Sequence, residues 1–363
     1  MPKQIIRHIA LTIGVATALS GGLMGQSSPP RPDAMSLVGT DTIKAFIASR
    51  AQKNWTPPTT PWGDPDISGV FTTKDEANTP FERPDEWAGR KMDDITPKEF
   101  AEAIVKRQQR AVEQAPFAGG GEPEEGVAIA VPIHWFDNLA AKNSRPWFVI
   151  DPPEGRVPSV TPEGDRQVKE VRQQRAVRAG EATNRGGRRD TYMDRSIGDR
   201  CILVGGHWML PAIYGNSFQV LQTKDYVVIR QEMVHEARLV PIEGRRSTQL
   251  APVRSYGGSV RGRWDGNSFL VETTNFRADI PYRDASTRDL RMVERFTRIA
   301  PNKVERTVTI DNPTVYPRPW TYSLPMTVDD GQLIHEYACH EGNFGMANLL
   351  SAGREADQGR APK

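Results

Sequence analysis

The fold of this chain is decided between Phe218 and Phe276, where the longest strand-like run is YVVIRQEMVHEARL at Tyr226–Leu239. The run is rich in β-branched residues, which favour strands, and alternate side chains of a strand point to opposite faces. One face is mostly apolar and the other is mixed: Val227, Ile229, Gln231, Met233, His235, Ala237 and Leu239 against Tyr226, Val228, Arg230, Glu232, Val234, Glu236 and Arg238. The pattern predicts one long strand, with its first face toward a core and its second toward solvent or a polar cavity.

Further strand-like runs precede and follow this one at short spacing. Short polar connections such as Lys224–Asp225 and Asp265–Asn267 separate them, as in β-hairpins. The predicted strands are 218–223, 226–239, 259–264, 268–276, 292–299, 304–310 and 333–339. Sequential hairpins are typical of a meander, which removes exposed sheet edges when it closes. The predicted fold is therefore mainly β: an antiparallel up-and-down barrel of calycin or lipocalin type, with two peripheral helices.

The chain divides into five predicted segments. Residues 1–26 carry Lys3 and Arg7, then an apolar run of about 11 residues, which is typical of a cleaved signal peptide and too short to span a bilayer. The other segments are a Pro-rich extended lead-in at 27–62, first strands with two surface helices at 63–198, the main barrel meander at 199–350, and a flexible tail at 351–363. Within 63–198 the helices are predicted at 96–113 and 161–178, and a strand pair at 133–136 and 146–150.

Charge and cysteine content limit the partners and the compartment. The 47 basic and 45 acidic residues of the 363-residue chain give a net charge of +2, so no overall field favours nucleic acid. No later segment is long and apolar enough to predict stable membrane insertion. We therefore expect a periplasmic or secreted protein that binds a small organic ligand or substrate, with its oligomeric state open. In that oxidising compartment the two cysteines, Cys201 and Cys339, are expected to form a disulfide, the alternative being two buried thiols.

Several motifs along the chain resemble those of one family. They are PDISGVF at 65–71, DPPEGR at 151–156, DRC at 199–201, EMVHEAR at 232–238, GRW at 262–264, VETTNF at 271–276 and CHEGN at 339–343. Together they are similar to a large family of secreted bacterial proteins, common in soil bacteria, whose members usually have Trp in place of Phe71. The resemblance spans nearly the whole chain after the predicted signal peptide. It implies export but no activity, because the family supplies no catalytic residues.

The candidate catalytic residues gather around the expected disulfide. Pairing Cys201 with Cys339 would hold their Cα atoms within about 7 Å and so bring Arg200 close to His340 and Glu341. His340 is the candidate proton-transfer residue because an imidazole titrates near neutral pH. Glu341 or Glu336 would orient it, and Arg200 would stabilise negative charge that develops on a substrate. The structural alternative is a salt-bridged network that holds the last strand in place.

Glu232 and His235 are the two remaining candidates. A regular strand would place them on opposite faces, so they form a dyad only if a bulge intervenes, and His235 on an apolar face also fits a hydrogen-bonded core residue. His235, His335 and His340 with a carboxylate are an alternative zinc site, although the five-residue spacing from His335 to His340 does not fit the helical zinc motif. Neither a metal nor an organic cofactor is predicted. Glu272 and Glu294 are expected to pair with Arg263 and Arg295.

Three functions follow from these residues. The first is a cofactor-independent acid–base enzyme of lyase, hydratase or isomerase type that encloses a small organic molecule. The second is a non-catalytic, lipocalin-like carrier of an apolar or aromatic ligand, and the third is a metal-dependent hydrolase. The first two are distinguished by whether Arg230, Glu232 and Glu336 point into an enclosed cavity.

Overall fold

The computed structural model describes residues 41–113, 141–181, 191–203, 209–212, 214–244, 253–278, 281–329, 331 and 333–358. The predicted signal peptide at 1–26 and the predicted strand at 133–136 lie outside these ranges. No helix within them is long and apolar enough to cross a membrane.

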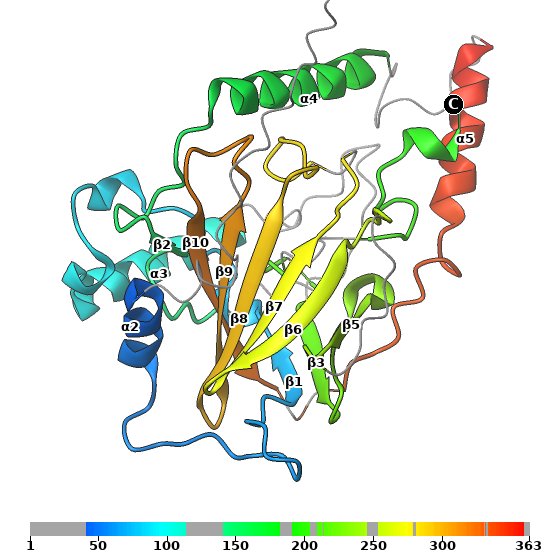
Figure 1. Ribbon diagram of the computed structural model, residues 1–363. Helices are drawn as coiled ribbons and strands as arrows, with labels where there is room; N and C mark the ends of the chain where they lie inside the picture. The colour runs from blue at the N-terminus through cyan, green and yellow to red at the C-terminus, as the bar shows by residue number, and fades with distance from the viewer. Residues whose placement is uncertain are drawn as a thin grey trace, which may run out of the picture. The chain divides into compact units, whose positions relative to one another are not determined.

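Ten strands in the described ranges form one antiparallel sheet (Figure 1). They are β1 (Gly69–Thr72), β2 (Val149–Asp151), β3 (Ser217–Gln222), β4 (Tyr226–Gln231), β5 (Ala237–Pro241), β6 (Ser259–Asp265), β7 (Ser268–Thr274), β8 (Arg291–Ala300), β9 (Lys303–Asp311) and β10 (Trp320–Val328). The order across the sheet is β5-β4-β3-β1-β10-β9-β8-β7-β6, and β2 also pairs with β10. The prediction of a mainly β, antiparallel fold is confirmed.

The strand β1 joins two separate meanders, which differs from the single meander predicted at 199–350. The chain runs through β3, β4 and β5 as one meander and through β6 to β10 as the other. Between them lies β1, which pairs with β3 along Gly69–Thr72 and with β10 at Phe71 and Thr72. Phe71 is fully buried. A short strand from the first quarter of the chain therefore connects the two halves of the sheet.

The sheet is not closed, so the predicted barrel is not confirmed. Its edge strands β5 and β6 meet at a single point, where Ile242 and Gly262 form a parallel bridge and the Glu243 N–H donates to the Gly262 carbonyl at 2.7 Å. Closure of an up-and-down barrel needs a continuous ladder between its first and last strands. Among the described residues this is the only bridge between the two edges, and its Ile242 lies just after the five-residue β5. The sheet therefore curves until its edges touch without forming a ladder.

The predicted strand Tyr226–Leu239 is two strands, because the chain turns between β4 and β5. Met233–His235 forms a short 3-10 turn, and Val234 and His235 have left-handed φ angles of 58° and 44°. Such angles are unusual for a β-branched residue. Val227 and Ile229 in β4 are buried as predicted, but after the turn the alternation is reversed: Arg238 is buried and Leu239 is 49% exposed.

The C-terminal part also differs from the prediction. No strand is found at 333–339, where Leu333–Ala338 has no regular structure and Cys339 lies in a turn, and the last strand of the described sheet is β10. Prolines near and within β10, at 317, 319 and 325, mask its strand character. The predicted flexible tail begins inside a helix, α5 (Phe344–Asp357), and the predicted extended lead-in contains another, α2 (Asp41–Arg50).

The two helices predicted outside the sheet are present. They are α3 (Pro97–Glu113) and α4 (Pro162–Glu181). At the start of α3, Thr96 and Glu99 form the predicted reciprocal cap, in which each side chain accepts from the other residue's backbone N–H. Thr161 caps α4 by accepting from the Gly164 N–H at 3.0 Å. The single 3-10 turns are η1 (Lys74–Glu76), η2 (Asp85–Trp87), η3 (Met92–Asp94), η6 (Tyr192–Asp194) and η8 (Met233–His235).

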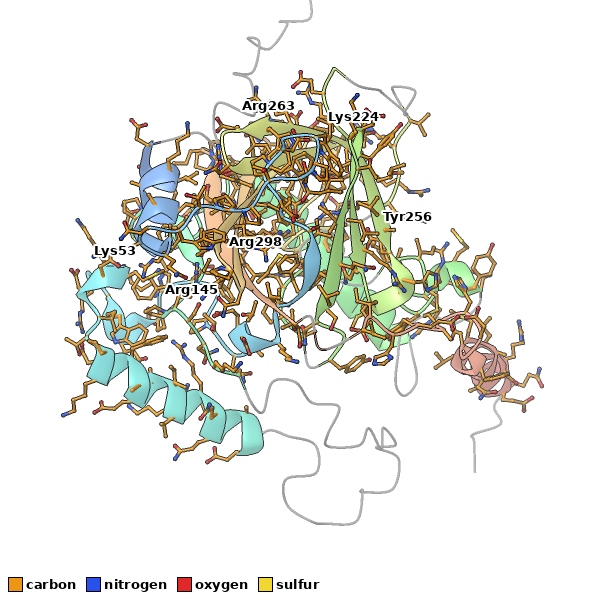
Figure 2. All side chains as sticks on the ribbon, turned by 90° about the horizontal axis from the view of Figure 1, so that it is seen from below. Lys53, Arg145, Lys224, Tyr256, Arg263 and Arg298 are labelled. Atoms are coloured by element: carbon orange, nitrogen blue, oxygen red, sulfur yellow. A yellow bond between two sulfur atoms is a disulfide. The ribbon has the colours of Figure 1, made fainter. Side chains whose placement is uncertain are left out.

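The two faces of the sheet are buried in different ways. One face, here called the inner face, carries the large apolar side chains of the core, including Phe71, Phe218, Phe269 and Trp320. Val240 in β5 belongs to the same apolar cluster as Phe269 and Val271 in β7, so strands from both ends of the sheet order surround one core. Figure 2 shows side chains filling the space that the curved sheet surrounds. The opposite, outer face is partly covered by α2, whose Ile43 and Ile47 pack on Ile299 of β8.

Candidate functional site

A cluster of charged and phenolic side chains interrupts the apolar inner face. It consists of Arg238 from β5, Glu294 from β8, Arg306 from β9 and Tyr322 from β10, and we call it the inner-face cluster. These residues are 6%, 0%, 0% and 0% exposed, in that order. Lysine, glutamate and arginine side chains are almost never fully buried unless they are paired. A set of this kind in the middle of a core is therefore either a structural ion-pair network or a functional site.

Strand alternation explains how these residues reach the core. Glu294 lies between the buried residues Met292 and Phe296 on one face of β8, and Arg306 lies in the same way between Val304 and Val308 on β9. Tyr322 and Glu294 both lie opposite Val308 in the ladder that joins the three strands. The cluster therefore stands on the boundary between the two apolar clusters of the inner face.

The contact of Arg238 with Glu294 crosses the concave side of the sheet. Five strands separate β5 from β8 in the sheet order in one direction, and β6 and β7 lie between them in the other. Arg238 nevertheless forms a two-pronged ion pair with Glu294, in which Nη2 lies 3.2 Å from Oε1 and Nη1 contacts Oε2. Its Nη2 also lies 3.4 Å from the sulfur of Met209. The curvature of the sheet thus brings together residues that neither chain order nor strand order makes neighbours.

Arg306 approaches the same carboxylate from β9. Its Nε donates to Glu294 Oε1 at 2.9 Å, and its Nη2 lies 2.7 Å from the same oxygen. Two guanidinium groups and one carboxylate therefore share this buried position and together carry one formal positive charge, and the half-buried Glu236 also attracts Arg238. Burial acts to lower the pKa of Arg238, but the attraction of Glu294 outweighs it, so the pKa is raised overall. Arg238 therefore stays charged at neutral pH.

Two tyrosines at the cluster remain neutral at physiological pH. Burial raises the pKa of Tyr322 to about 12, although the Arg306 guanidinium acts in the opposite direction. Burial also raises the pKa of Tyr282 well above its ordinary value. Tyr282 stacks on Trp320 with ring centroids 6.3 Å apart and 11° between the planes. The inner face therefore combines excess positive charge, neutral phenol donors and an aromatic wall, which suit an anionic oxygen attached to an apolar group.

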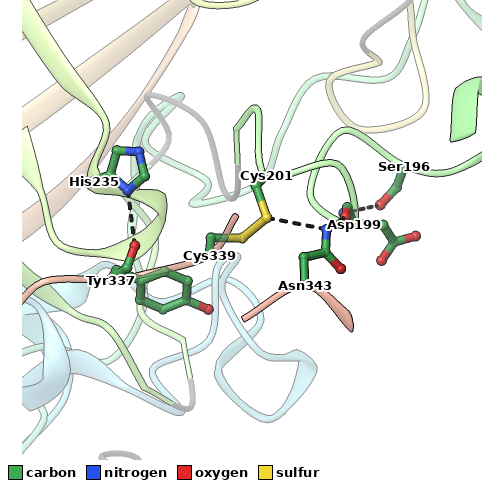
Figure 3. Close-up of a disulfide and its surroundings, with 7 residues drawn as sticks. All are labelled: Ser196, Asp199, Cys201, His235, Tyr337, Cys339 and Asn343. Carbon is green, nitrogen blue, oxygen red and sulfur yellow. Dashed lines mark hydrogen bonds between the residues drawn. A yellow bond between two sulfur atoms is a disulfide. The ribbon is translucent and has the colours of Figure 1, made fainter. Parts of the chain in front are cut away.

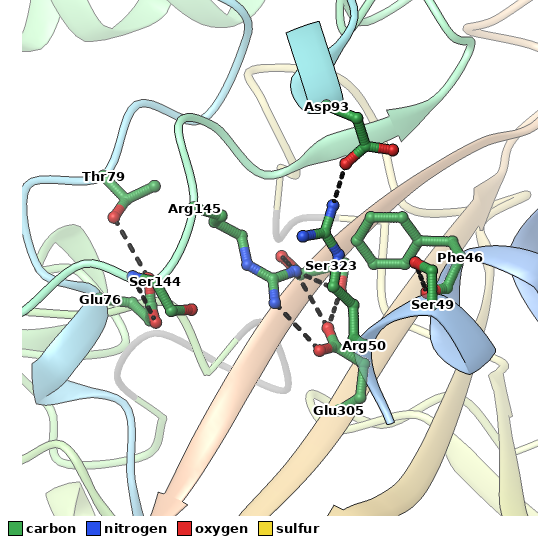
Figure 4. A network of polar contacts seen from close by, with 10 residues as sticks. All are labelled: Phe46, Ser49, Arg50, Glu76, Thr79, Asp93, Ser144, Arg145, Glu305 and Ser323. Carbon is green, nitrogen blue, oxygen red and sulfur yellow. Dashed lines mark hydrogen bonds and ion pairs between the residues drawn. The ribbon is translucent and has the colours of Figure 1, made fainter. Parts of the chain in front are cut away.

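A second buried arginine–glutamate pair lies on the outer face of the same sheet (Figure 4). Arg145 forms two parallel hydrogen bonds of 3.0 Å with Glu305 of β9. Its Nη1 also contacts Ser323 Oγ at 2.7 Å, and its guanidinium lies 5.6 Å from the Phe46 ring of α2. The single positive charge of Arg145 is balanced by the single negative charge of Glu305. This outer-face pair ties the segment before β2 to the sheet, and nothing in its geometry suggests a ligand site.

The predicted disulfide between Cys201 and Cys339 is confirmed, with Cα atoms 5.8 Å apart (Figure 3). The bridge brings together part of the predicted site. The ring centroids of His235 and His340 lie 6.3 Å apart, and His235 Nδ1 lies 3.0 Å from the Tyr337 carbonyl oxygen. The Asn343 amide donates to the Asp199 carbonyl oxygen at 2.8 Å.

The other predicted site residues are placed less favourably. Glu336, Glu341 and both histidines are exposed, while Arg200 and Glu232 are half-buried. The Arg200 guanidinium lies 5.6 Å from the Tyr192 ring, and within the described ranges no hydrogen bond or ion pair joins it to His340 or Glu341. The opposite-face argument for Glu232 and His235 assumed a regular strand and does not apply, because both residues belong to the turn between β4 and β5.

Two further expectations are corrected by the side-chain contacts. Glu272 pairs with Arg261, and Glu294 pairs with Arg238 and Arg306, so the predicted partners Arg263 and Arg295 were wrong. No three histidine, cysteine, aspartate or glutamate side chains in the described part of the chain could hold a metal ion together. His235, His335 and His340 therefore do not form the alternative zinc site within those ranges.

None of the four residues of the inner-face cluster was among the predicted site residues: Arg238 was assigned only to the mixed face of the predicted strand, Glu294 was expected only as an ion-pair partner, and Arg306 and Tyr322 were not singled out. A signal for Arg306 was present, because a charged residue at the centre of the apolar alternation of β9 is unusual in a core strand. No signal in the sequence marked Tyr322, because no strand was predicted where β10 lies. Comparison of the chain with family models, with curated proteins and with solved structures found no match.

Proposed function

We propose that this protein binds a small organic molecule through a carboxylate or similar anionic oxygen at the inner-face cluster. The observation that carries the proposal is the convergence of Arg238, Arg306 and neutral Tyr322 around the single carboxylate of Glu294. One bound carboxylate would bring the charge of the cluster to zero. An arginine fork matches a carboxylate in geometry as well as in charge.

The chemistry of the inner face favours an anionic aromatic ligand over a purely apolar one. A carrier for apolar molecules would surround its ligand with apolar side chains, and two buried guanidinium groups would be costly there. The aromatic rings of Tyr282 and Trp320, on the same inner face, would pack against the apolar part of the ligand. A small aromatic or otherwise unsaturated acid combines both requirements.

The edge strand β5 offers the route to this site. Glu294 and Arg306 are fully buried, whereas Arg238 is on a five-residue strand that meets β6 at only one bridge. Edge elements with few hydrogen bonds open at low free-energy cost. Movement of β5 away from β6 would expose Arg238 first, and the ligand would then replace part of its pairing with Glu294.

Binding of matched acids and esters to the purified protein tests this proposal. Calorimetric titration with benzoate and with methyl benzoate compares two ligands of similar shape, of which only the first is charged. We expect benzoate to bind and the ester not to bind. Arg238→Gln should weaken benzoate binding about tenfold or more, because it removes a charge-assisted hydrogen bond worth roughly 1.5 to 3 kcal/mol.

Arg145→Gln is the matched control. It also removes a buried arginine from an ion pair with a glutamate, but on the outer face. It should lower stability while leaving benzoate affinity unchanged. Equal binding of the acid and the ester, or equal loss of affinity in the two variants, would rule out the inner-face cluster as the binding site.

A second candidate function is acid–base catalysis at the disulfide, with His340 as the proton-transfer residue. It is favoured by the closeness of the His235 and His340 rings and by the contact of His235 Nδ1 with a backbone carbonyl, which leaves Nε2 of His235 available. Glu336 or Glu341 would orient His340, and Arg200 would stabilise developing negative charge. If any small acid is turned over, His340→Ala should abolish turnover without changing the affinity for benzoate.

We also infer that the protein is exported to the periplasm or beyond. The supporting observations are the basic and then apolar pattern at residues 1–26 and the Cys201–Cys339 bridge, since disulfides persist in oxidising compartments. Mass spectrometry of cell fractions, run without reductant, would locate the processed chain. A full-length protein found only in the cytoplasm would overturn the inference.

A further inference from the structure

A groove of about 550 Å³ lies between one face of α3 and the segment that precedes it. The α3 wall is formed by residues three and four positions apart, Ala103, Lys106, Arg107, Arg110 and Ala111, which share one face of a helix. The opposite wall is formed by residues 78–86 together with Arg156. The volume falls in the range of small-molecule sites, about 300 to 1,000 Å³.

Positive charge predominates in this groove. Five basic and three acidic side chains line it. Two of the acidic groups already have cationic partners: Glu82 pairs with Arg283 at 2.8 Å, and Asp85 pairs with Arg156. In contrast, no salt bridge to another described residue involves Lys106, Arg107 or Arg110. The α3 wall of the groove therefore presents three cations, and the carboxylates that act on Arg107 are those of exposed Glu86 and of Glu76.

Arg107 is the fixed element of the site. Its Nη2 donates to the Pro146 carbonyl oxygen at 2.8 Å, and its guanidinium lies 5.9 Å from the ring centres of both Trp87 and Phe100. Its Nη1 is buried and has no acceptor among the described residues. Burial lowers the pKa of Arg107 to about 10, so the group remains a cation at neutral pH.

We propose that this groove is a second binding site, which takes a small oxyanion with two negative charges. Arg107 would supply a fixed positive charge at the groove wall, because its side chain is already held by the rings and by the carbonyl and loses little freedom on binding. Lys106 and Arg110 lie one position before and three positions after Arg107 and would contact the same anion from the rim. The two candidate chemistries are a phosphate and a dicarboxylate, which present similar oxygen pairs to a guanidinium fork.

Calorimetric titration with inorganic phosphate and with succinate, at an ionic strength held constant with chloride, tests the site and identifies its chemistry. We expect saturable binding of one probe, and that probe defines the ligand class. Arg110→Gln and Lys106→Gln should each weaken it about tenfold, the effect of losing a charge-assisted contact of roughly 1.4 kcal/mol. Both side chains are exposed, so these variants should fold as the parent does.

Lys98→Gln is the matched control, because it removes the same charge from the same helix at an exposed position that does not line the groove. It should leave the affinity unchanged, and so should Arg238→Gln at the inner-face cluster, which keeps the two sites distinguishable. The proposal is overturned if neither probe binds saturably, or if Lys98→Gln or Arg238→Gln weakens binding as much as Arg110→Gln does.

Discussion

Two buried arginine–glutamate pairs lie on opposite faces of one sheet, and they differ in charge balance. On the outer face, Arg145 meets Glu305 in a fork of two 3.0 Å hydrogen bonds, one cation to one anion. On the inner face, Arg238 and Arg306 both pair with the carboxylate of Glu294, and Glu236 also attracts Arg238. Glu305 and Arg306 are consecutive residues of β9, so strand alternation sends them to opposite sides.

The difference teaches how to separate a structural pair from a candidate site. Glu294 and Glu305 are each 0% exposed, so burial alone does not distinguish the structural pair from the candidate site. The outer-face pair joins a loop segment to a strand, and its charges cancel. The four residues of the inner-face cluster carry a formal charge of +1 beside neutral phenols, with only the half-buried Glu236 as a further anion acting on Arg238 among the causes of its raised pKa, and excess charge in a core is costly. We expect a protein to retain a buried excess positive charge where a bound ligand supplies the missing negative charge.

The largest expected effect comes from removing the inner carboxylate. Glu294→Gln removes the carboxylate that both buried guanidinium groups contact, and loss of one partner from a buried pair costs about 3 to 5 kcal/mol. Glu305→Gln should cost less, because it leaves one guanidinium that retains its contacts with Ser323. Urea unfolding of the two variants measures both values. An equal or reversed order would remove the distinction between the two pairs.

Replacing both partners of a pair by apolar residues sharpens the comparison. Arg145→Met combined with Glu305→Leu should change the free energy of unfolding by no more than about 2 kcal/mol, since a buried pair is often replaceable by apolar groups of similar size. Arg306→Met combined with Glu294→Leu leaves Arg238 unpaired in the core and should cost roughly 3 kcal/mol or more. Denaturation midpoints of the two double variants test this, and similar losses would contradict it.

Tyr322 of the inner-face cluster leads to a prediction about the stability of the protein at alkaline pH. The pKa of Tyr322 is about 12 in the folded protein and about 10 in an unfolded chain, so the folded state holds this proton more tightly. The resulting stability is fully present below pH 10 and is lost as the pH rises toward 12, by roughly 2 to 3 kcal/mol. Tyr322→Phe should show a smaller loss between pH 10 and 11.5 in urea unfolding. Identical pH profiles would contradict the raised pKa.

The smallest expected effect tests which side of β5 faces inward. Leu239 is 49% exposed, so Leu239→Gln should change the free energy of unfolding by about 0.5 kcal/mol or less, as most surface substitutions do. If the alternation predicted for an unbroken strand were correct, Leu239 would be a core residue and its loss would cost about 2 to 5 kcal/mol. Urea unfolding distinguishes the two values directly.

Local patterns in the sequence were enough for much of the secondary structure. Period-two alternation and turn residues predicted strands close to β3, β4, β6, β7, β8 and β9. The Thr96–Glu99 pair predicted the start of α3, and the count of two cysteines predicted the disulfide. Each of these signals acts over a few residues or follows from composition, so it can be read without knowledge of the fold.

Tertiary structure decided the rest, above all which charges meet. The turn at Met233–His235 reversed the alternation of β5 and placed Arg238 in the core, although its residues read as a strand. The partner of Arg238 is Glu294, which is remote from it in the chain and separated from it by other strands in the sheet. Only the curvature of the sheet brings the two together. Alternation assigns a side chain to a face, but its contacts across a concave face depend on packing that involves every strand.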